Sequence, residues 1–135
     1  MVCVQCQQKT QVINSRPQRR TNQQWRRRQC TSCNAVFSTI EAVDYSAVWR
    51  VKRPSGELVP FSRDKLLLSI TYSLEHRPKS LEDASGITNT VISKLRSIFN
   101  NGTLTTKQII QAVQVALNRF DKAGSVHYQA NHSIN

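Results

Sequence analysis

Two Cys-x-x-Cys pairs constrain the fold of this chain more than any other feature. Cys3 and Cys6 form the first pair, and Cys30 and Cys33 form the second. Each two-residue spacer lets the chain turn so that both sulfurs point at one ion, and two such knuckles complete a tetrahedral four-thiolate zinc site. All four ligands are protein thiolates, so no position remains for a catalytic water. The pairs therefore predict one structural zinc ion per chain.

The cellular compartment decides whether clustered cysteines are more often metal ligands or disulfides. No apolar run reaches the length of a membrane span, and the N-terminus "MVCVQCQQKTQ" lacks the apolar core of a signal peptide. We therefore expect a cytoplasmic protein, where clustered cysteines bind metal more often than they form disulfides. Redox-active pairs and unrelated cysteines are the alternatives.

Short strands are predicted around the knuckles. Residues 10–14, "TQVIN", and 25–29, "WRRRQ", are the first two, "VFSTIE" is the third, and "SRPQRRTNQQ" is a loop between the first two. This outline predicts a zinc ribbon over residues 1–45. A segment of this size buries little apolar surface, so zinc is expected to supply most of its folding free energy.

The charge of the chain is high and unevenly placed. Lys and Arg number 19 against 8 Asp and Glu, giving a net charge of +11, and all acidic residues lie from Glu41 onward. This imbalance predicts a polyanionic partner, either nucleic acid or a membrane surface, and for the ribbon we take it to be nucleic acid. A merely solvated basic face is the alternative. The predicted DNA-binding residues are Arg16, Arg19, Arg20, Arg26, Arg27 and Arg28.

Alternation along a strand predicts how three of these arginines are displayed. Arg26 and Arg28 are expected to share one face, with Arg27 on the opposite face and Trp25 beside it. Asn and Gln side chains in the loop are able to hydrogen-bond phosphates or base edges.

Residues 48–135 predict a second, α+β domain. "VWRVKR" and "ELVPF" form a hairpin around the turn "PSG". Three amphipathic helices follow, because apolar residues recur at helical spacing. Their predicted caps are Ser62, a Ser80–Asp83 box and a Thr105–Gln108 box, and they end at "HRP", at "NNG" and at Gly124.

The apolar stripes of these helices are predicted to be core, with no role in binding a cofactor. The first is Leu66, Leu67, Ile70 and Leu74; the second is Ile87, Val91, Leu95 and Ile98; the third is Ile109, Val113, Leu117 and Phe120.

Chemistry-bearing residues are sparse in this domain. It has no Gly-rich phosphate loop, no Ser/His/Asp set and no paired carboxylates at a plausible site, so we predict that the protein is not an enzyme. Lys52, Arg53 and Lys65 are candidates to converge on a polyphosphate. The three histidines are expected at the surface or at helix ends.

Two motifs carry a resemblance that covers nearly the whole chain. "CVQC … VINSRP … WRRRQCTSCNAVFSTIE" resembles the zinc ribbon of the NrdR family, bacterial repressors of ribonucleotide reductase genes. "RVKRPSGELVPFSRDKL" and the downstream "LEHRPKS" resemble the ATP-cone that follows this ribbon in the family. The order and spacing of the two motifs agree with the family.

The resemblance implies a zinc-dependent, nucleotide-responsive repressor in the bacterial cytoplasm, at the nucleoid. Its ribbon would bind paired operator boxes in double-stranded DNA, and its cone would bind ATP or dATP and change the homo-oligomeric state. Carried over by position, the nucleotide motif contains Val51, Lys52, Arg53 and Lys65.

The chain departs from the family pattern at its second domain. Ser62 replaces an Asp, His76 replaces a Lys, and the tail "GSVHYQANHS" lacks most of the usual aromatic and arginine side chains. We therefore expect at most one nucleotide per cone.

Two rival functions remain. One is a zinc ribbon that binds RNA or a polymerase, with a degenerate cone used for protein docking. The other is a regulatory cone that acts directly on an enzyme subunit, which the basic ribbon argues against.

Overall fold

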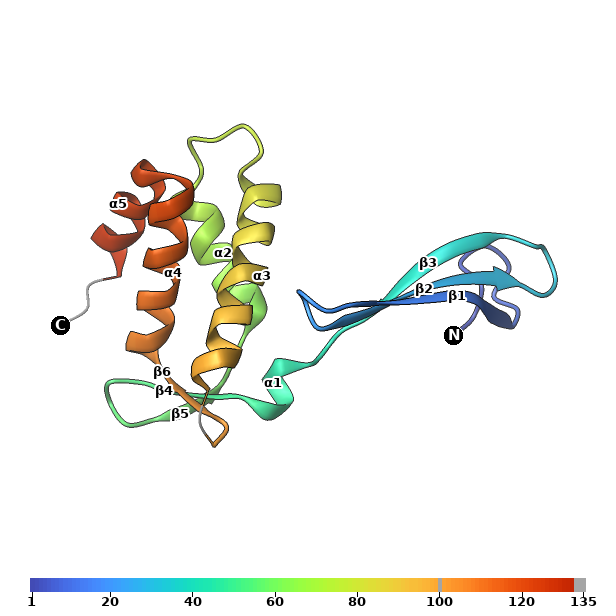
Figure 1. The fold of residues 1–135 in the computed structure, drawn as a ribbon, viewed down its shortest axis with the longest axis horizontal. Helices are drawn as coiled ribbons and strands as arrows, with labels where there is room; N and C mark the ends of the chain where they lie inside the picture. The colour runs from blue at the N-terminus through green and yellow to red at the C-terminus, as the bar shows by residue number, and fades with distance from the viewer. Residues whose placement is uncertain (100, 133–135) are drawn as a thin grey trace. The chain divides into compact units, whose positions relative to one another are not determined.

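The structure is a computed structural model that describes residues 1–99 and 101–132. The chain divides into two compact units, Met1–Val43 and Asp44–Asn135. A strand region that carries four cysteines precedes a second sheet with helices (Figure 1), which confirms the predicted α+β class. Within the described ranges, no helix is long and apolar enough to cross a membrane.

Unit 1 is built on a three-stranded antiparallel sheet in the order β1-β2-β3. The three predicted strands are all present, as β1 (Thr10–Gln18), β2 (Gln23–Cys30) and β3 (Val36–Glu41). An isolated bridge between Val2 and Lys9 closes the first knuckle region.

The predicted loop between the first two strands is shorter than expected. Ser15 to Gln18 belong to β1 and Gln23 to β2, so the turn contains only residues 19–22, with Asn22 at a φ of 53°. Pro17 lies within β1. It is accommodated because β1 is an edge strand with one neighbour, and its open side needs no backbone donor.

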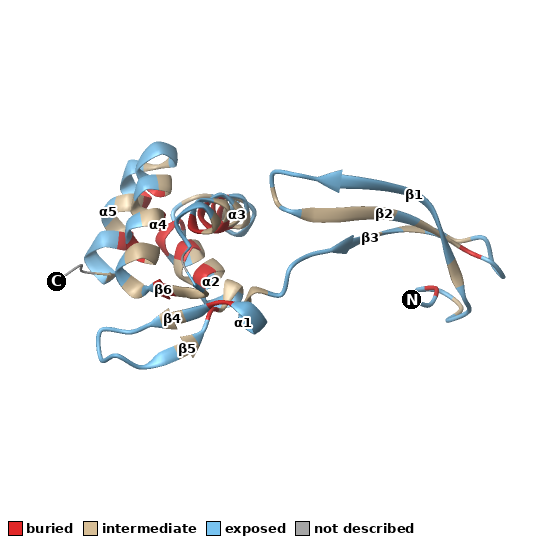
Figure 2. Ribbon diagram, turned by 60° about the horizontal axis from the view of Figure 1, so that its bottom comes forward, coloured by how far each residue is buried: buried red, intermediate tan, exposed pale blue. Residues whose placement is uncertain are grey.

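Burial in unit 1 is nearly confined to the cysteines. Among residues 1–43, Cys3 and Cys30 are the buried residues, and β1 is exposed over almost its whole length. Figure 2 shows the sheet of unit 1 in the colours of exposed and half-buried residues. The sheet has no apolar core of its own.

Unit 2 begins with the short helix α1 (Tyr45–Val48) and contains a second three-stranded sheet in the order β5-β4-β6. The predicted hairpin is β4 (Arg50–Lys52) with β5 (Leu58–Pro60), and β6 (Thr103–Thr105) lies parallel to β4. Neither α1 nor β6 was predicted, because elements of three or four residues carry no measurable periodicity.

Four longer helices complete unit 2: α2 (Arg63–Ser73), α3 (Ser80–Ile98), α4 (Thr106–Phe120) and α5 (Lys122–Asn131). The caps at Ser62 and at Thr105 with Gln108 are confirmed. The predicted box at Ser80 is wrong, because α3 has no side-chain cap. Asp83 instead accepts a hydrogen bond from Nε of Arg77 at 2.8 Å.

Helix α5 was missed because Gly124 was predicted to end α4. In the structure the side chain of Asp121 accepts a hydrogen bond from the backbone N–H of Gly124 at 2.9 Å and starts a new helix. A Cβ at Gly124 would lie 2.6 Å from Cδ2 of Leu74. The glycine therefore permits close contact between α5 and the end of α2.

The core of unit 2 gathers side chains from the sheet and all four longer helices, and Figure 2 shows its buried residues on the inward faces of the helices. Ile110 is buried and Ile109 only partly so, while Ile98 and Phe120 are exposed by 38% and 45%. The other predicted core positions are buried or packed against the core. The buried set is Trp49, Phe61, Leu66, Ile70, Leu74, Ala84, Ile87, Val91, Ile92, Leu95, Leu104, Ile110, Val113, Leu117 and Tyr128.

Candidate metal, nucleic-acid and nucleotide sites

The four cysteines of unit 1 converge on one point. Their Sγ atoms all lie within 4.8 Å of one another, with Cys3 and Cys33 at 3.7 Å and Cys6 and Cys30 at 3.4 Å. A zinc ion with Zn–S bonds of about 2.3 Å requires S···S edges of roughly 3.8 Å. The donor set therefore fits a tetrahedral zinc ion, as the sequence predicted.

The two knuckles have the same local geometry. Gln7 and Asn34, which directly follow the second cysteine of each pair, both have a φ of 60°. The N–H of Cys3 donates to the carbonyl of Gln8 at 2.8 Å, and the N–H of Cys30 donates to that of Ala35 at 2.9 Å. This repeated turn brings both thiols of each pair to one side of the chain.

Backbone dipoles within the knuckles favour thiolates. The N–H groups of Cys33 and Ser32 donate to Sγ of Cys30 and lower the pKa of that thiol to about 6. The N–H groups of Cys6 and Gln5 lower the pKa of Cys3 in the same way. The neighbouring thiols and burial act in the opposite direction on Cys33 and raise its pKa to about 12. Since the thiolate is the form that binds metal, Cys3 and Cys30 are the two thiols that the backbone prepares for a cation.

The arginines of unit 1 surround the same sheet. Arg16 lies on β1, and Arg26, Arg27 and Arg28 lie on β2 with the predicted alternation. Arg19 and Arg20 lie in the turn between the strands. The guanidinium of Arg16 lies 5.9 Å from the ring centroid of Trp25. The sheet thus presents cations beside an aromatic ring, a combination suited to nucleic acid.

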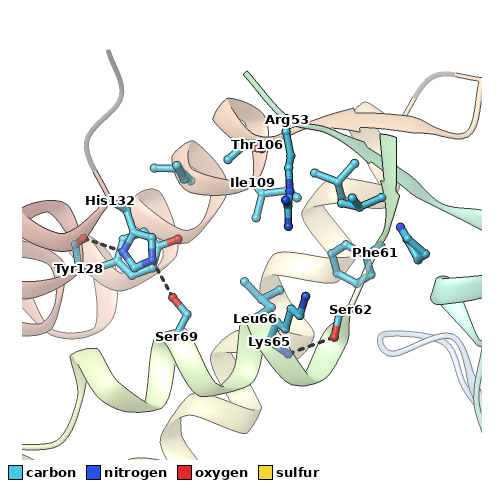
Figure 3. Close-up of a pocket in the computed structure, with 14 residues that line it drawn as sticks. Arg53, Phe61, Ser62, Lys65, Leu66, Ser69, Thr106, Ile109, Tyr128 and His132 are labelled. Carbon is cyan, nitrogen blue, oxygen red and sulfur yellow. Dashed lines mark hydrogen bonds between the residues drawn. The ribbon is translucent and has the colours of Figure 1, made fainter. Parts of the chain in front are cut away.

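A cavity of about 230 Å³ opens in unit 2 between the sheet, α2, α4 and α5. Arg53, just after β4, and Lys65 of α2 extend into it toward each other, and Tyr128 of α5 and His132 at the C-cap of α5 also line it (Figure 3). The N–H of Lys65 is capped by Ser62, which also lines the cavity. Cations and a helix N-terminus together favour an anionic group such as phosphate.

The aromatic side of the cavity is ordered by hydrogen bonds. The imidazole of His132 is stacked on Tyr128, with ring centroids 4.0 Å apart, and its Nε2 is 3.1 Å from Oγ of Ser69. Its Nδ1 is 3.0 Å from the carbonyl oxygen of Tyr128. Burial raises the pKa of Tyr128 to about 12, so its hydroxyl stays neutral.

Comparison with known proteins assigns each unit to a domain family. Residues 1–41 match the family described as the N-terminal domain of NrdR-like transcriptional repressors, and residues 50–131 match the ATP cone domain. A protein of Afipia carboxidovorans named Transcriptional repressor NrdR is 34% identical over 119 residues, which cover 88% of this chain and 74% of the relative. One of the same name from Exiguobacterium sp. is 32% identical over 129 residues, covering 95% and 82%.

The chain belongs to the NrdR family of transcriptional repressors. The resemblance inferred from the motifs is confirmed, and so is the prediction that the protein is not an enzyme, because this family consists of repressors.

The predicted nucleotide residues are only partly brought together. Val51, Arg53 and Lys65 line the cavity, whereas Lys52 is exposed and is not among the described residues that line it. Adjacent residues of β4 point to opposite faces of the sheet, which separates Lys52 from Val51.

His76 lies apart from this cavity. The NrdR pattern suggested it as a weak phosphate partner in place of a lysine, but its Nε2 is 3.0 Å from Oδ2 of Asp121. NH1 of Arg77 donates to the same oxygen at 2.9 Å. Hydrogen bonds from the N–H of Gly124, from His76 and from Arg77 lower the pKa of Asp121 well below its usual range. His76 therefore stabilises the junction between α4 and α5.

Sequence reasoning missed the residues that α5 contributes to the cavity. Tyr128 lies on α5 and His132, four residues later, is its C-cap, a spacing that would have placed them on one side of the helix had the helix been predicted. Ser69 lies one turn after Lys65 on α2, and this spacing was a usable signal. The end of the divergent tail, from residue 133 onward, and the first Asn of "NNG" lie outside the described residues.

Proposed function

We propose that this chain is a zinc-dependent, nucleotide-responsive repressor that binds double-stranded DNA, with ribonucleotide reductase genes as its targets. The observation that carries the proposal is the presence, in one NrdR-family chain, of a four-cysteine basic ribbon and a separate cavity with cationic and aromatic walls. We assign DNA binding to residues 1–45 and nucleotide binding to residues 48–135.

Zinc holds the ribbon, one ion per chain. The ligands are Cys3, Cys6, Cys30 and Cys33, whose sulfur spacing matches a tetrahedral thiolate site. The ion would supply charge neutralisation and a fixed crosslink between the knuckles. The chain's own residues do the rest, because the second knuckle fixes the C-terminal end of β2 at Cys30, close to Arg26, Arg27 and Arg28.

The basic ribbon supplies the affinity for DNA. Six arginines lie between residues 16 and 28, and arginine–phosphate contacts release counterions and strengthen binding at low salt. The candidates from the sequence are Arg16, Arg19, Arg20, Arg26, Arg27 and Arg28. Family membership favours duplex DNA over RNA or a polymerase as the partner.

The cavity of unit 2 binds one adenine nucleotide, ATP or dATP. Arg53 and Lys65 are the cations available to a triphosphate, and charge-assisted hydrogen bonds of this kind are the strong ones. Val51 and Ile109 offer apolar contact, and the His132 ring offers a surface on which a base is able to stack. Occupancy of this cavity changes the homo-oligomeric state of the repressor in the cytoplasm and thereby its hold on DNA.

The test of repression uses the full-length protein with zinc and a duplex taken from upstream of a ribonucleotide reductase gene of the same genome. A shuffled duplex and an RNA of equal length are the controls. We expect at least about a thousandfold tighter binding to the upstream duplex, the lower end of the range that separates specific from non-specific DNA binding. Equal binding to all three would contradict the proposal, and a preference for RNA would favour the RNA-binding alternative.

The test of nucleotide response compares Lys65→Ala with Lys52→Ala by calorimetry and sedimentation. A lost charged hydrogen bond costs about 1.5–3 kcal/mol, so Lys65→Ala should weaken ATP or dATP binding by roughly tenfold or more. Lys52, which does not line the cavity, serves as the matched removal of one charge. An equal loss in both variants would restore Lys52 to the site, and a wild-type protein that binds no nucleotide would contradict this half of the proposal.

A further inference from the structure

The two faces of the unit 1 sheet differ in chemistry, and the strand register defines each. Directly paired residues on neighbouring strands point to the same side. Rows across β1, β2 and β3 therefore assign side chains to a face. We call one the Trp25 face; its rows are Arg16–Trp25–Ile40 and Asn14–Arg27–Ser38. We call the other the Arg26 face; its rows are Ser15–Arg26–Thr39, Val12–Arg28–Phe37 and Pro17–Gln24–Glu41.

The arginines of the Arg26 face are engaged within the sheet. Arg26 forms an ion pair with Glu41 through its NH1. Nε of Arg28 donates to Oγ1 of Thr39 at 3.3 Å, and Phe37 is half-buried beside it. The ion pair with Glu41 cancels one of the two positive charges on this face. Contact with a phosphate would have to displace it.

The Trp25 face carries cations that are available. Arg27 is exposed, and within the described part of the chain its side chain makes no hydrogen bond or ion pair. Across the sheet it is flanked by Asn14 and Ser38, both exposed and both able to hydrogen-bond phosphates or base edges. The rows of this face contain no acidic residue.

The other row of the Trp25 face, Arg16–Trp25–Ile40, contains an aromatic and an apolar side chain. The guanidinium of Arg16 lies over Trp25 at 5.9 Å from the ring centroid, and Ile40 on the other side of Trp25 is 60% exposed. An open ring beside a cation suits contact with the sugar, the base edge or the thymine methyl of a duplex. Exposed apolar area of this kind is poorly explained by solubility.

We infer that the Trp25 face is the surface of the ribbon that contacts duplex DNA, with Arg27 as its central residue, and that the Arg26 face maintains the sheet. This inference rests on the proposed function, since it names the DNA-contacting surface of the same site. It differs from the sequence-based prediction, in which Arg26 and Arg28 bind DNA in the same way as Arg27. Proteins with β-ribbons and β-sheets place strands in the major or minor groove of DNA, so the face of a sheet is able to contact base edges.

The closing experiment compares two neighbouring arginines of β2 in the full-length zinc-loaded protein. Arg27→Ala and Arg28→Ala each remove one charge from the same strand, and one lies on each face. Affinity for the upstream duplex is measured by fluorescence anisotropy from low to physiological salt. Arg27→Ala should weaken binding at least about fivefold and lower the salt slope by about 0.9. Arg28→Ala, whose guanidinium is hydrogen-bonded to Thr39 within the sheet, should weaken binding by a smaller factor than Arg27→Ala.

A second readout uses the tryptophans. Trp49 is buried in unit 2, whereas Trp25 is half-buried on the sheet of unit 1. Bound duplex should protect the emission of Trp25 from acrylamide, and Trp25→Phe should remove the protected signal. Zinc content and circular dichroism of each variant confirm that its ribbon is intact.

The outcomes separate the two claims. Duplex binding that Arg28→Ala and Arg26→Ala weaken, while Arg27→Ala and Arg16→Ala do not, overturns the face and leaves DNA binding in place. An exposed Trp25 in the bound state also overturns the face. A wild-type protein without duplex binding overturns both the face and the proposed function.

Discussion

Each of the two units of this chain is stabilised in a different way. Unit 1 buries Cys3 and Cys30 and has no apolar core, whereas the described residues of unit 2 include fifteen buried apolar side chains. Burial of about 25 cal/mol per Å² of apolar surface stabilises unit 2, while little such area exists in unit 1. The comparison shows that the regular strands of unit 1 have no apolar core to stabilise them, and that a metal ion on the four cysteines would take the place of that core.

Removal of zinc should have the largest effect and should be confined to unit 1. Structural zinc contributes on the order of 10–16 kcal/mol in small four-ligand domains, so chelation or Cys30→Ser should unfold the ribbon. Trypsin should then cleave within residues 16–28, where six arginines lie. The helical signal at 222 nm should persist, because within the described residues every helix lies in unit 2.

Ser32→Ala is the matched control for this prediction. Ser32 lies in the same knuckle and contributes its backbone N–H, which the substitution retains. It should keep zinc and resist trypsin. A chelated protein that stays protected within the ribbon would show that the sheet is stable without metal and would remove the contrast between the units.

The reciprocal experiment damages the core of unit 2. Leu117 of α4 is fully buried, and Leu→Ala at such sites costs about 2–5 kcal/mol because it leaves a cavity. Denaturant unfolding at 222 nm should show this loss, while zinc content stays at one ion per chain. Val115→Ala on the same helix, at a position 53% exposed, should change the unfolding free energy by less than about 0.5 kcal/mol. Loss of zinc from Leu117→Ala would mean that the two units fold as one.

The contrast also explains which features the sequence predicted. The metal site follows from residue type and spacing alone, because a knuckle is local, and Cys3 to Cys33 came together as expected. The helical stripes of Val91, Leu95, Val113 and Leu117 follow from a period that is also local. Patterns that are complete within one element were predictable.

Features that depend on a partner far away in the chain were not predictable from the sequence. The strand β6 exists because Leu104 pairs with Val51, far away in the chain, and α5 is positioned by the contact of Gly124 with Leu74. The ion pair of Arg26 with Glu41 depends on the register between β2 and β3. The composition of both candidate surfaces was therefore predictable, but which of their residues are free to bind was not.

A smaller effect is expected in unit 2, whose unfolding free energy should depend on pH through Asp121. Asp121 has a lowered pKa in the folded chain, chiefly because the N–H of Gly124 donates to it and because His76 and Arg77 lie on its other oxygen. Its contribution to stability is present above the unfolded pKa near 3.9 and is lost as pH falls toward the folded value. Asp121→Asn keeps a good N-cap and removes the charge.

We therefore expect Asp121→Asn to lower the unfolding free energy of unit 2 by about 1 kcal/mol at pH 7, the scale of a charged hydrogen bond weakened to a neutral one. The difference from wild type should shrink between pH 5 and 2, because the aspartate itself becomes neutral there. The 222 nm signal reports unit 2 even after acid has released zinc from unit 1. Glu75→Gln, at an exposed residue near the same junction, is the control and should show no such convergence. A difference that stays constant across this range would mean that the cap geometry at Asp121, and not its charge, holds α5 in place.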